Sequence, residues 1–393
     1  MVELADIFRR FGGSYLSAYG TTMPSWHRRA IKDVLDCRTA ELGGQVWHCD
    51  ACDEDIFSYH SCGNRACPKC HAEQTQEWLE ARRAEILPCD YFHVTVTVPE
   101  ELRSLLRANQ LDGYAVLMKA AAEAIIELAR DPRYVGGTVG VLGVLHTWTQ
   151  QLAYHPHVHC LVTGGGVSAD GRDWYPARKD FLFPERALAK LVRGKLKALL
   201  AKQRPDLIAP AAAWKKRWVV HITPWGANPD HVLRYLARYV FRTAITNSRI
   251  LACDEKSVTI RYKDRKSSCL RTCKLSGHEF MRRFLQHVLP KGLHRVRYFG
   301  LWHPSQRAKV AQVRLRLTLD QTSKPLHQTG KPLDQKSTSP AEPAAPSEDK
   351  KPRQKADGPP PPRTCPLCGE GHLVYVRRLT PKDAATPKDA LGP

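Results

Sequence analysis

The sequence lacks a hydrophobic run long enough to cross a membrane. A membrane helix needs about 20 consecutive apolar residues, and the most apolar stretch, GYAVLMKAAAEAIIELA (113–129), is interrupted by Lys119, Glu123 and Glu127. The first residues, MVELADIFRRFGG, also lack a charged segment followed by an apolar one, so we expect no signal peptide. These absences predict a cytoplasmic protein that does not bind a membrane.

Acidic residues are also scarce relative to basic ones. The 393 residues include 39 Asp and Glu against 60 Lys and Arg, which gives a formal net charge of +21. This excess favours a nucleic-acid partner, because neutralising phosphates supplies most of the non-specific affinity for nucleic acid. A basic protein that binds no nucleic acid is the alternative. With 42% hydrophobic residues, the chain can still build a core.

Cysteine, in contrast, is abundant. The chain has 13 cysteines, an odd number, and they cluster, which favours metal binding over a disulfide framework. Two C-x-x-C pairs, CDAC and CPKC, have the spacing of a tetrahedral zinc site. Because four thiolates fill the coordination shell, this zinc would be structural rather than catalytic. The predicted ligands are Cys49, Cys52, Cys67 and Cys70.

More potential ligands lie near these pairs and at the far end of the chain. Arg65 and Lys69, beside the second pair, suit contact with DNA. The late CPLC motif, with Cys365 and Cys368, is half of a zinc site, to which His372 could add a third ligand. A second zinc, or support for the first, could come from four residues near the first two pairs: Cys37, His60, Cys62 and His71.

The pattern of the remaining chain alternates between helices and strands. Alternating β-branched residues predict strands, and apolar residues at a spacing of three to four predict helices. The pattern fades after about residue 306, and the stretch KSTSPAEPAAPSEDKKPRQKADGPPPP (336–362) has the composition of a disordered linker. Strands are expected within 91–99, 135–150, 155–166 and 257–263, and helices within 1–36, 72–87, 101–130, 186–203, 230–245 and 277–289.

Three histidines share one face of the strand in YHPHVHCLVTGGG (154–166). Side chains at i, i+2 and i+4 of a strand point the same way, so His155, His157 and His159 should converge. A single histidine is usually structural, but three in register favour a divalent metal site.

The helix predicted over 230–245 carries two tyrosines, Tyr235 and Tyr239, one turn apart on the same face. Tyrosines at this spacing can simply be buried in a core. Beside a metal and basic side chains, however, a phenol becomes a feasible nucleophile toward phosphate. A basic ridge with the same spacing, expected to contact DNA, consists of Arg234, Arg238 and Arg242.

Three segments together resemble the two-tyrosine transposases of the insertion-sequence-91 family, members of the HUH (His–hydrophobic–His) superfamily. They are SCGNRACPKC, HTWTQQLAYHPHVHCLVTGGG and YLARYVFRTAITNSRI, within a similarity over about residues 5–305. The family often has NRHCPKC where this chain has Ala66, which argues against a zinc-binding histidine there. The resemblance identifies Cys49, Cys52, Cys67 and Cys70 as the family's zinc ligands.

The resemblance also implies a mechanism. His157 and His159 would bind Mg²⁺ or Mn²⁺, and Tyr235 or Tyr239 would attack single-stranded DNA to form a 5′-phosphotyrosine in rolling-circle transposition. The third metal ligand is left open among His155, His93 and Asn247.

The fold implied is α+β: an antiparallel sheet with flanking helices, preceded by a small zinc-binding module and followed by a disordered tail. The expected divisions are 1–75 for the N-terminal helices and zinc module, 88–305 for the catalytic domain, and 306–393 for the linker and CPLC island.

Other functions fit parts of the pattern. A replication initiator or relaxase-type nickase would share the tyrosine chemistry. A non-catalytic, zinc-dependent DNA-binding regulator would need neither tyrosine near the histidines. A hydrolytic metalloenzyme fits less well, because no general-base carboxylate accompanies HPHVH.

Overall fold

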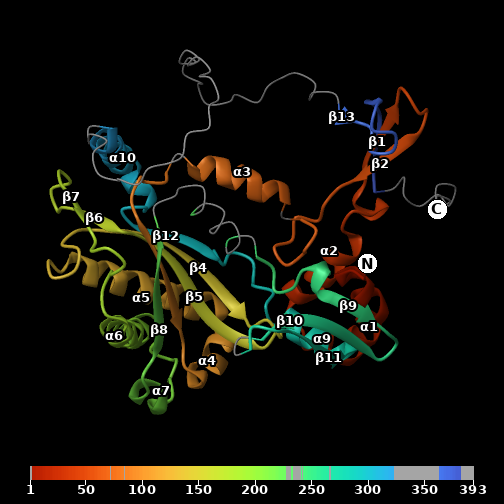
Figure 1. The fold of residues 1–393 in the computed structure, drawn as a ribbon. Coiled ribbons are helices and arrows are strands. Elements are labelled where there is room, and N and C mark those ends of the chain that lie inside the picture. Colours follow the sequence, from red (N-terminus) through yellow and green to blue (C-terminus); the bar gives the residue numbers. More distant parts are fainter. Residues whose placement is uncertain are drawn as a thin grey trace.

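The structure is a computed structural model, and it combines helices with antiparallel sheets, which confirms the α+β class (Figure 1). It describes residues 2–70, 72–83, 85–226, 232, 240, 242–264, 267–322 and 363–381.

Five strands of the described chain form the main sheet, and every neighbouring pair is antiparallel. The order is β12-β4-β5-β3-β8, so the histidine-bearing strand β5 is central. A short hairpin, β6–β7, follows β5. The bounds are β3 Tyr91–Thr97, β4 Gly140–Trp148, β5 Tyr154–Thr163, β6 Gly165–Val167, β7 Trp174–Pro176, β8 Val219–Gly226 and β12 Val296–Gly300.

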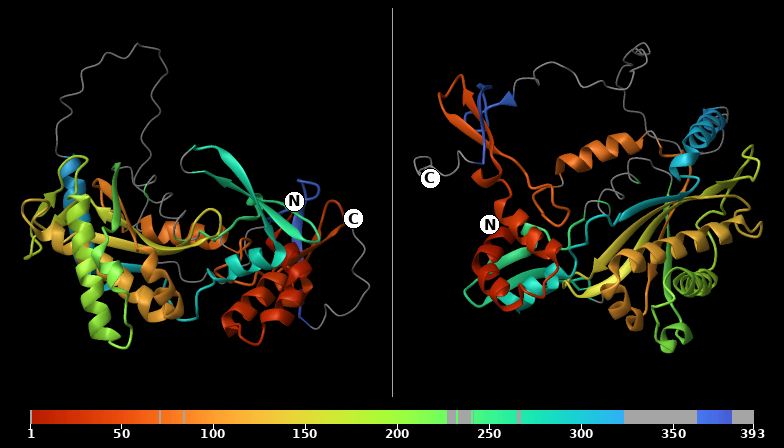
Figure 2. Two further views of the ribbon diagram at one scale, coloured as in Figure 1. Left: turned by 90° about the horizontal axis from the view of Figure 1, so that it is seen from below. Right: turned by 180° about the vertical axis from the view of Figure 1, so that it is seen from behind.

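One face of the main sheet is covered by helices α5 and α6 (Figure 2). Val94, Val96 and Val158 alternate along their strands and pack there against the alanine-rich side of α5. Successive side chains of a strand point to opposite faces of the sheet, so the remaining side chains of these strands point away from α5. The helices near this face are η2 Glu100–Leu102, α4 Arg103–Ala108, α5 Gln110–Arg130, α6 Glu185–Gln203 and α7 Ala211–Lys215.

The opposite face carries the histidines and has its own apolar cluster. Val144 and Leu161 of the sheet belong to it, together with Val232 and Val240 from the segment predicted to hold the tyrosines. Two further helices contribute side chains: α3 Ala72–Arg83 and α10 Arg307–Thr322, the latter preceded by η4 Pro304–Gln306. The main sheet is therefore covered on both faces.

The N-terminal helices pack against elements that come more than 200 residues later in the sequence. Phe8 of α1 meets Phe284 of α9 edge to face, with ring centroids 5.4 Å apart. The backbone amide of Leu4 donates to Asn247 Oδ1 at 3.1 Å. This unit comprises α1 Leu4–Tyr19, α2 Ser25–Asp36, η3 Asn247–Arg249, β9 Ile250–Cys253, β10 Ser257–Lys263, β11 Leu270–Ser276 and α9 Gly277–Leu285.

This packing unit combines helices α1 and α2 with the elements from η3 to α9, which come more than 200 residues later. The unit is therefore not contiguous in sequence. The divisions expected at 1–75, 88–305 and 306–393 stay predictions. Asn247, one of the candidate metal ligands, is held in this unit by Leu4 rather than placed with the histidines.

A four-stranded sheet joins the N-terminal cysteine region to the end of the described chain. Its order is β13-β14-β1-β2, with β14 paired antiparallel to β1. The bounds are η1 Ala40–Leu42, β1 Gly44–Cys49, β2 Asp55–Tyr59, β13 Arg363–Thr364 and β14 His372–Leu379. Figures 1 and 2 show these strands beside one another, apart from the main sheet.

Within the range 306–393, the structure adds a helix that the sequence did not predict and folds the CPLC island against a distant part of the chain. Residues 307–322 form helix α10, and 363–381 fold against the N-terminal hairpin. The linker between them lies outside the described residues. Within the described chain, no helix is both long enough and apolar enough to span a membrane.

Candidate active site and metal centres

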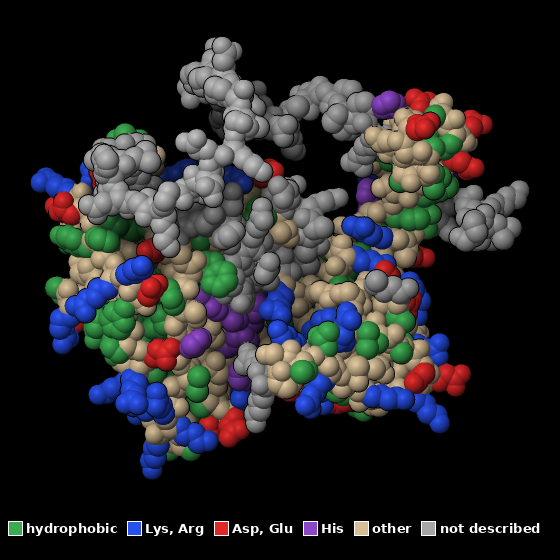
Figure 3. Space-filling model, in the orientation of Figure 1, with side chains coloured by type: hydrophobic (Ala, Val, Ile, Leu, Met, Phe, Trp, Pro, Cys, Tyr) green, Lys and Arg blue, Asp and Glu red, His purple; other side chains and the backbone are tan. Residues whose placement is uncertain are grey.

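Three histidines converge on one face of the main sheet. His157 and His159 lie on β5 and His146 on β4, and their ligand nitrogens all lie within 4.8 Å of one another. The strand register explains this, because His146 is directly opposite His157 in the antiparallel pair. Residues opposite each other share a face, and His159 follows two positions along it. Figure 3 shows histidine side chains gathered near the centre of the molecular face, with Lys and Arg beside them.

His155 does not belong to this group. Its Nδ1 accepts a hydrogen bond from Arg103 Nη2 at 3.1 Å, and only His146, His157 and His159 form a histidine cluster among the described residues. Of the candidates left open for the third position, His155 lies outside the cluster, and the structure instead places His146 with His157 and His159. His146 could not be predicted from the sequence, because its proximity to His157 depends on the register between two strands, which one sequence does not show.

Neighbouring groups orient the two β5 histidines. His157 Nδ1 donates to the carbonyl of His155 at 2.7 Å, and His159 Nδ1 lies 2.9 Å from His93 Nε2. Thr95 Oγ1 lies 3.3 Å from the same His159 nitrogen. A metal-binding histidine usually has its second ring nitrogen hydrogen-bonded in this way. His93 is thus placed as a supporting residue, and the Nε2 atoms of His157 and His159 as the potential ligands.

The environment favours the neutral form of His159 and of its neighbour His93, and the neutral imidazole is the form that binds metal. Burial, followed by repulsion from His146 and His157, holds the pKa of His159 far below its ordinary value. Burial, with a smaller contribution from His221, lowers the pKa of His93 to about 4. Three neutral imidazoles would leave the full charge of a bound cation available to a phosphate.

The two tyrosines and most of the basic ridge fall outside the described residues: Tyr235, Tyr239, Arg234 and Arg238. Within 227–241, the structure describes Val232 and Val240, and both are helical and buried. They belong to the apolar cluster on the histidine face. Arg295 donates to the carbonyl of Val240, and to that of Arg242 at 3.0 Å. The side chain of Arg242 is exposed.

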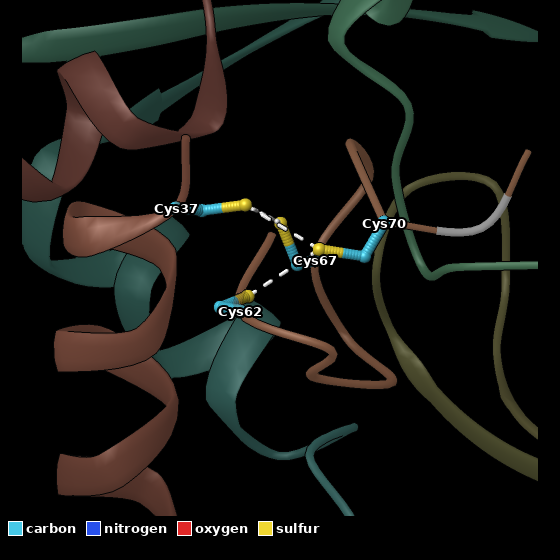
Figure 4. A group of neighbouring side chains, drawn as sticks. All are labelled: Cys37, Cys62, Cys67 and Cys70. Carbon is cyan, nitrogen blue, oxygen red and sulfur yellow. Dashed lines mark hydrogen bonds between the residues drawn. The ribbon is translucent and has the colours of Figure 1, made fainter. Parts of the chain in front are cut away.

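One cysteine cluster lies where α2 ends (Figure 4). Its sulfur atoms are in contact: Cys37 and Cys70 are 3.3 Å apart, Cys62 and Cys70 are 3.4 Å apart, and Cys67 and Cys37 are 3.6 Å apart. Four sulfurs around one tetrahedral zinc lie about 3.8 Å apart, because Zn–S bonds are about 2.3 Å long. The cluster fits a structural zinc with little adjustment.

The expected zinc ligand set was therefore wrong as a set. Cys67 and Cys70 join Cys37 and Cys62, whereas Cys49 and Cys52 lie in another cluster with Cys365 and Cys368. The C-x-x-C spacing identifies each pair but not which pairs meet. The expected contributions of His60, and of His372 to the late motif, are not seen in these clusters. His71 lies outside the described residues.

The thiols of the first cluster influence one another's protonation. A hydrogen bond from Cys67 lowers the pKa of Cys62 to about 6, while burial raises the pKa of Cys37 to about 11. Cys62 is thus favoured as a thiolate, while Cys37 resists losing its proton. A bound cation would stabilise the thiolate form of both.

The two basic residues near this cluster serve the fold rather than an open DNA surface. Arg65 donates to the carbonyls of Leu293 at 2.6 Å and Pro290 at 3.1 Å, and Lys69 forms an ion pair with Glu3. The zinc module is thereby fastened to the rest of the protein.

Both the N-terminal cysteine region and the histidine-bearing sheet match families of known proteins. Residues 7–98 match a family described as "Transposase zinc-binding domain", and residues 140–309 one described as "Putative transposase". The chain is thus a DNA transposase. A protein named "Putative transposase y4qJ", from Sinorhizobium fredii, is 37% identical over 95% of this chain and 94% of its own length.

A second relative is named as the transposase for insertion sequence element IS801, from Pseudomonas savastanoi pv. phaseolicola. It is 28% identical over 69% of this chain and 68% of its own length. No solved structure matches. The chain belongs to the IS91 family of insertion-sequence transposases with an N-terminal zinc-binding domain, as the sequence motifs indicated.

Proposed function

We propose that this transposase nicks and rejoins single-stranded DNA through a 5′-phosphotyrosine in rolling-circle transposition. The observation that carries the proposal is the cluster of His146, His157 and His159 on the sheet face that also holds Val232 and Val240. Those two valines flank the predicted tyrosines in sequence and pack on this face. On the expected helical spacing, a tyrosine hydroxyl can reach a phosphate held at the histidines.

The chemistry of the cluster suits a protein nucleophile. Among the described residues, the group consists of histidines alone and includes no carboxylate to act as a general base for water. A tyrosine hydroxyl would attack the phosphorus, form the Tyr–O–P bond and release a 3′-hydroxyl. Reversal by a 3′-hydroxyl would rejoin the strand, so no external energy source is needed.

The three imidazoles fit a divalent cation, which when bound would polarise the scissile phosphate. Imidazole nitrogens suit Mn²⁺ better than Mg²⁺, which prefers oxygen ligands. The histidines would hold the cation while phosphate oxygens and water complete its shell. The exposed Arg242, with Arg234 and Arg238 on the predicted ridge, would neutralise neighbouring phosphates.

The test is a denaturing gel of a labelled single-stranded oligonucleotide that carries an end of the element, incubated with protein and Mn²⁺. We expect a covalent protein–DNA adduct that the double substitution of Tyr235 and Tyr239 to Phe abolishes, and that either single substitution reduces. Tyr175→Phe is the matched control, since Tyr175 lies exposed on β7. An adduct that survives in the double variant would place the nucleophile elsewhere.

DNA binding and catalysis should separate. His157→Ala should remove cleavage but leave DNA binding, because binding depends on the basic surface. If Mn²⁺ produces no adduct while the DNA is still bound, the protein is a non-catalytic DNA-binding protein under these conditions and the proposal fails.

A further inference from the structure

The second cysteine cluster brings together two motifs from opposite ends of the chain. Cys49 Sγ lies 3.8 Å from Cys368 Sγ, and Cys52 Sγ lies 3.8 Å from Cys365 Sγ. The four sulfurs all lie within 4.8 Å of one another. Both family matches end by residue 309, so neither includes the two late cysteines.

The two motifs fold into the same turn. In the first, the amide of Asp53 donates to the carbonyl of Cys49 at 3.1 Å, and in the second the amide of Gly369 donates to the carbonyl of Cys365 at 3.0 Å. Asp53 and Gly369 both have left-handed backbones, with φ of 60° and 74°. Each turn directs its two sulfurs to the same side, as in the knuckles of structural zinc sites.

Backbone amides in the second turn point at its sulfurs. Leu367 donates to Cys365 Sγ at 3.4 Å, and Gly371 donates to Cys368 Sγ at 3.3 Å. Donors that favour the charged form of a thiol are appropriate for a metal-binding thiolate. Neither feature is needed by a pair of ordinary reduced cysteines.

We propose that Cys49, Cys52, Cys365 and Cys368 bind a second structural zinc, which fastens residues 363–381 to the N-terminal hairpin. The 3.8 Å separations equal the edge of a zinc tetrathiolate of about 3.8 Å. They are far longer than the roughly 2.05 Å of a disulfide. Zinc binding would displace the thiol protons and leave four thiolates on one cation.

The segment needs such a fastening because its apolar side chains bury little surface. Val374, Tyr375 and Val376 on β14 are 55%, 51% and 49% exposed. Strands with so little buried surface are marginal without another source of stability. In small modules the binding energy of zinc is folding energy. The site would therefore make the N-terminal zinc-binding region depend on residues near the far end of the chain.

The experiment is metal analysis of the purified, reduced full-length protein. We expect two zinc ions per chain in the wild type and one in the double variant Cys365→Ser, Cys368→Ser. Cys269→Ser is the matched control and should keep two, since the exposed Cys269 belongs to neither cysteine cluster. One zinc in the wild type, or two in the double variant, would overturn the proposal.

Three further variants guard against a general folding defect. A chain ending at Pro381 should retain two zinc ions, and one ending at residue 362 should retain one. Gly371→Ala removes no ligand, but its Cβ would lie 2.4 Å from Cys49 Sγ, so it should also lose the second zinc. Retention of the first zinc in each variant shows that Cys37, Cys62, Cys67 and Cys70 are still assembled. Two zinc ions in the chain ending at 362 would contradict the proposed ligands.

Discussion

Replacing His146 tests the one member of the histidine cluster that the strand pattern did not predict. His146→Ala removes one of three converging imidazoles, whereas His155→Ala removes a side chain that is bonded to Arg103 and lies outside the cluster. His93→Ala removes the partner of His159 Nδ1. Metal affinity should therefore fall most in the His146 variant, less in the His93 variant and least in the His155 variant.

The expected magnitudes follow from these contacts. Losing an outer-shell partner such as His93 typically weakens metal binding by about 10- to 100-fold. Losing His146, a proposed direct ligand, should weaken metal binding by at least the upper limit of that range, about 100-fold or roughly 2.8 kcal/mol. His155→Ala should stay within about threefold of the wild type, or roughly 0.7 kcal/mol.

The assay is titration of each variant with Mn²⁺ by calorimetry, followed by the Mn²⁺ dependence of oligonucleotide cleavage. Thermal unfolding is measured alongside, because His146 is buried and its truncation leaves a small cavity. Equal losses in the His146 and His155 variants, or a larger loss for His155, would refute the assignment of His146.

Four further outcomes follow from the packing and the buried groups. Burial lowers the pKa of His287 to about 3 from an ordinary 6.5, so its contribution to stability is complete above pH 6.5 and is lost as the pH falls toward 3. Between about pH 3 and 6.5, the free energy of unfolding measured in urea should rise by up to about 1.4 kcal/mol per pH unit because of this group. The same pH dependence in His287→Gln would count against this role of His287. Gly277→Ala should destabilise by about 1–3 kcal/mol, because the new Cβ would lie 2.2 Å from the ring of Phe11. Gly194→Ala, in helix α6 with nothing within 4 Å, should instead stabilise by about 0.5–1 kcal/mol, and the same urea titrations decide both signs. Cys67→Ser should lose the first zinc and lower the melting temperature, which metal analysis and calorimetry check together.

Local patterns in the sequence were enough to predict much of the architecture. Alternation in YFHVTVTVP and HPHVHCLVTGGG correctly predicted two central strands, because strand periodicity is a property of a few consecutive residues. The same periodicity placed His157 and His159 on one face. The C-x-x-C spacing likewise identified each cysteine pair as a metal-binding turn.

What the sequence did not provide was long-range pairing. His146 enters the histidine cluster only through its register with β5, and Cys49 meets Cys368 across 319 residues. Helix α10 was missed because the apolar pattern fades after residue 306 and the helix is held by a few contacts of Val310 and Val313 with the histidine face. Such contacts are decided by the packing of the whole chain.

The most direct test of the proposed mechanism is peptide mapping of the covalent adduct by mass spectrometry. The protein is incubated with single-stranded DNA and Mn²⁺, digested with nuclease and protease, and searched for a nucleotide-modified residue. We predict a 5′-phosphate ester on Tyr235 or Tyr239 that is absent from the His146 and His157 variants. An adduct on any other residue, or cleavage that yields no adduct at all, would contradict it.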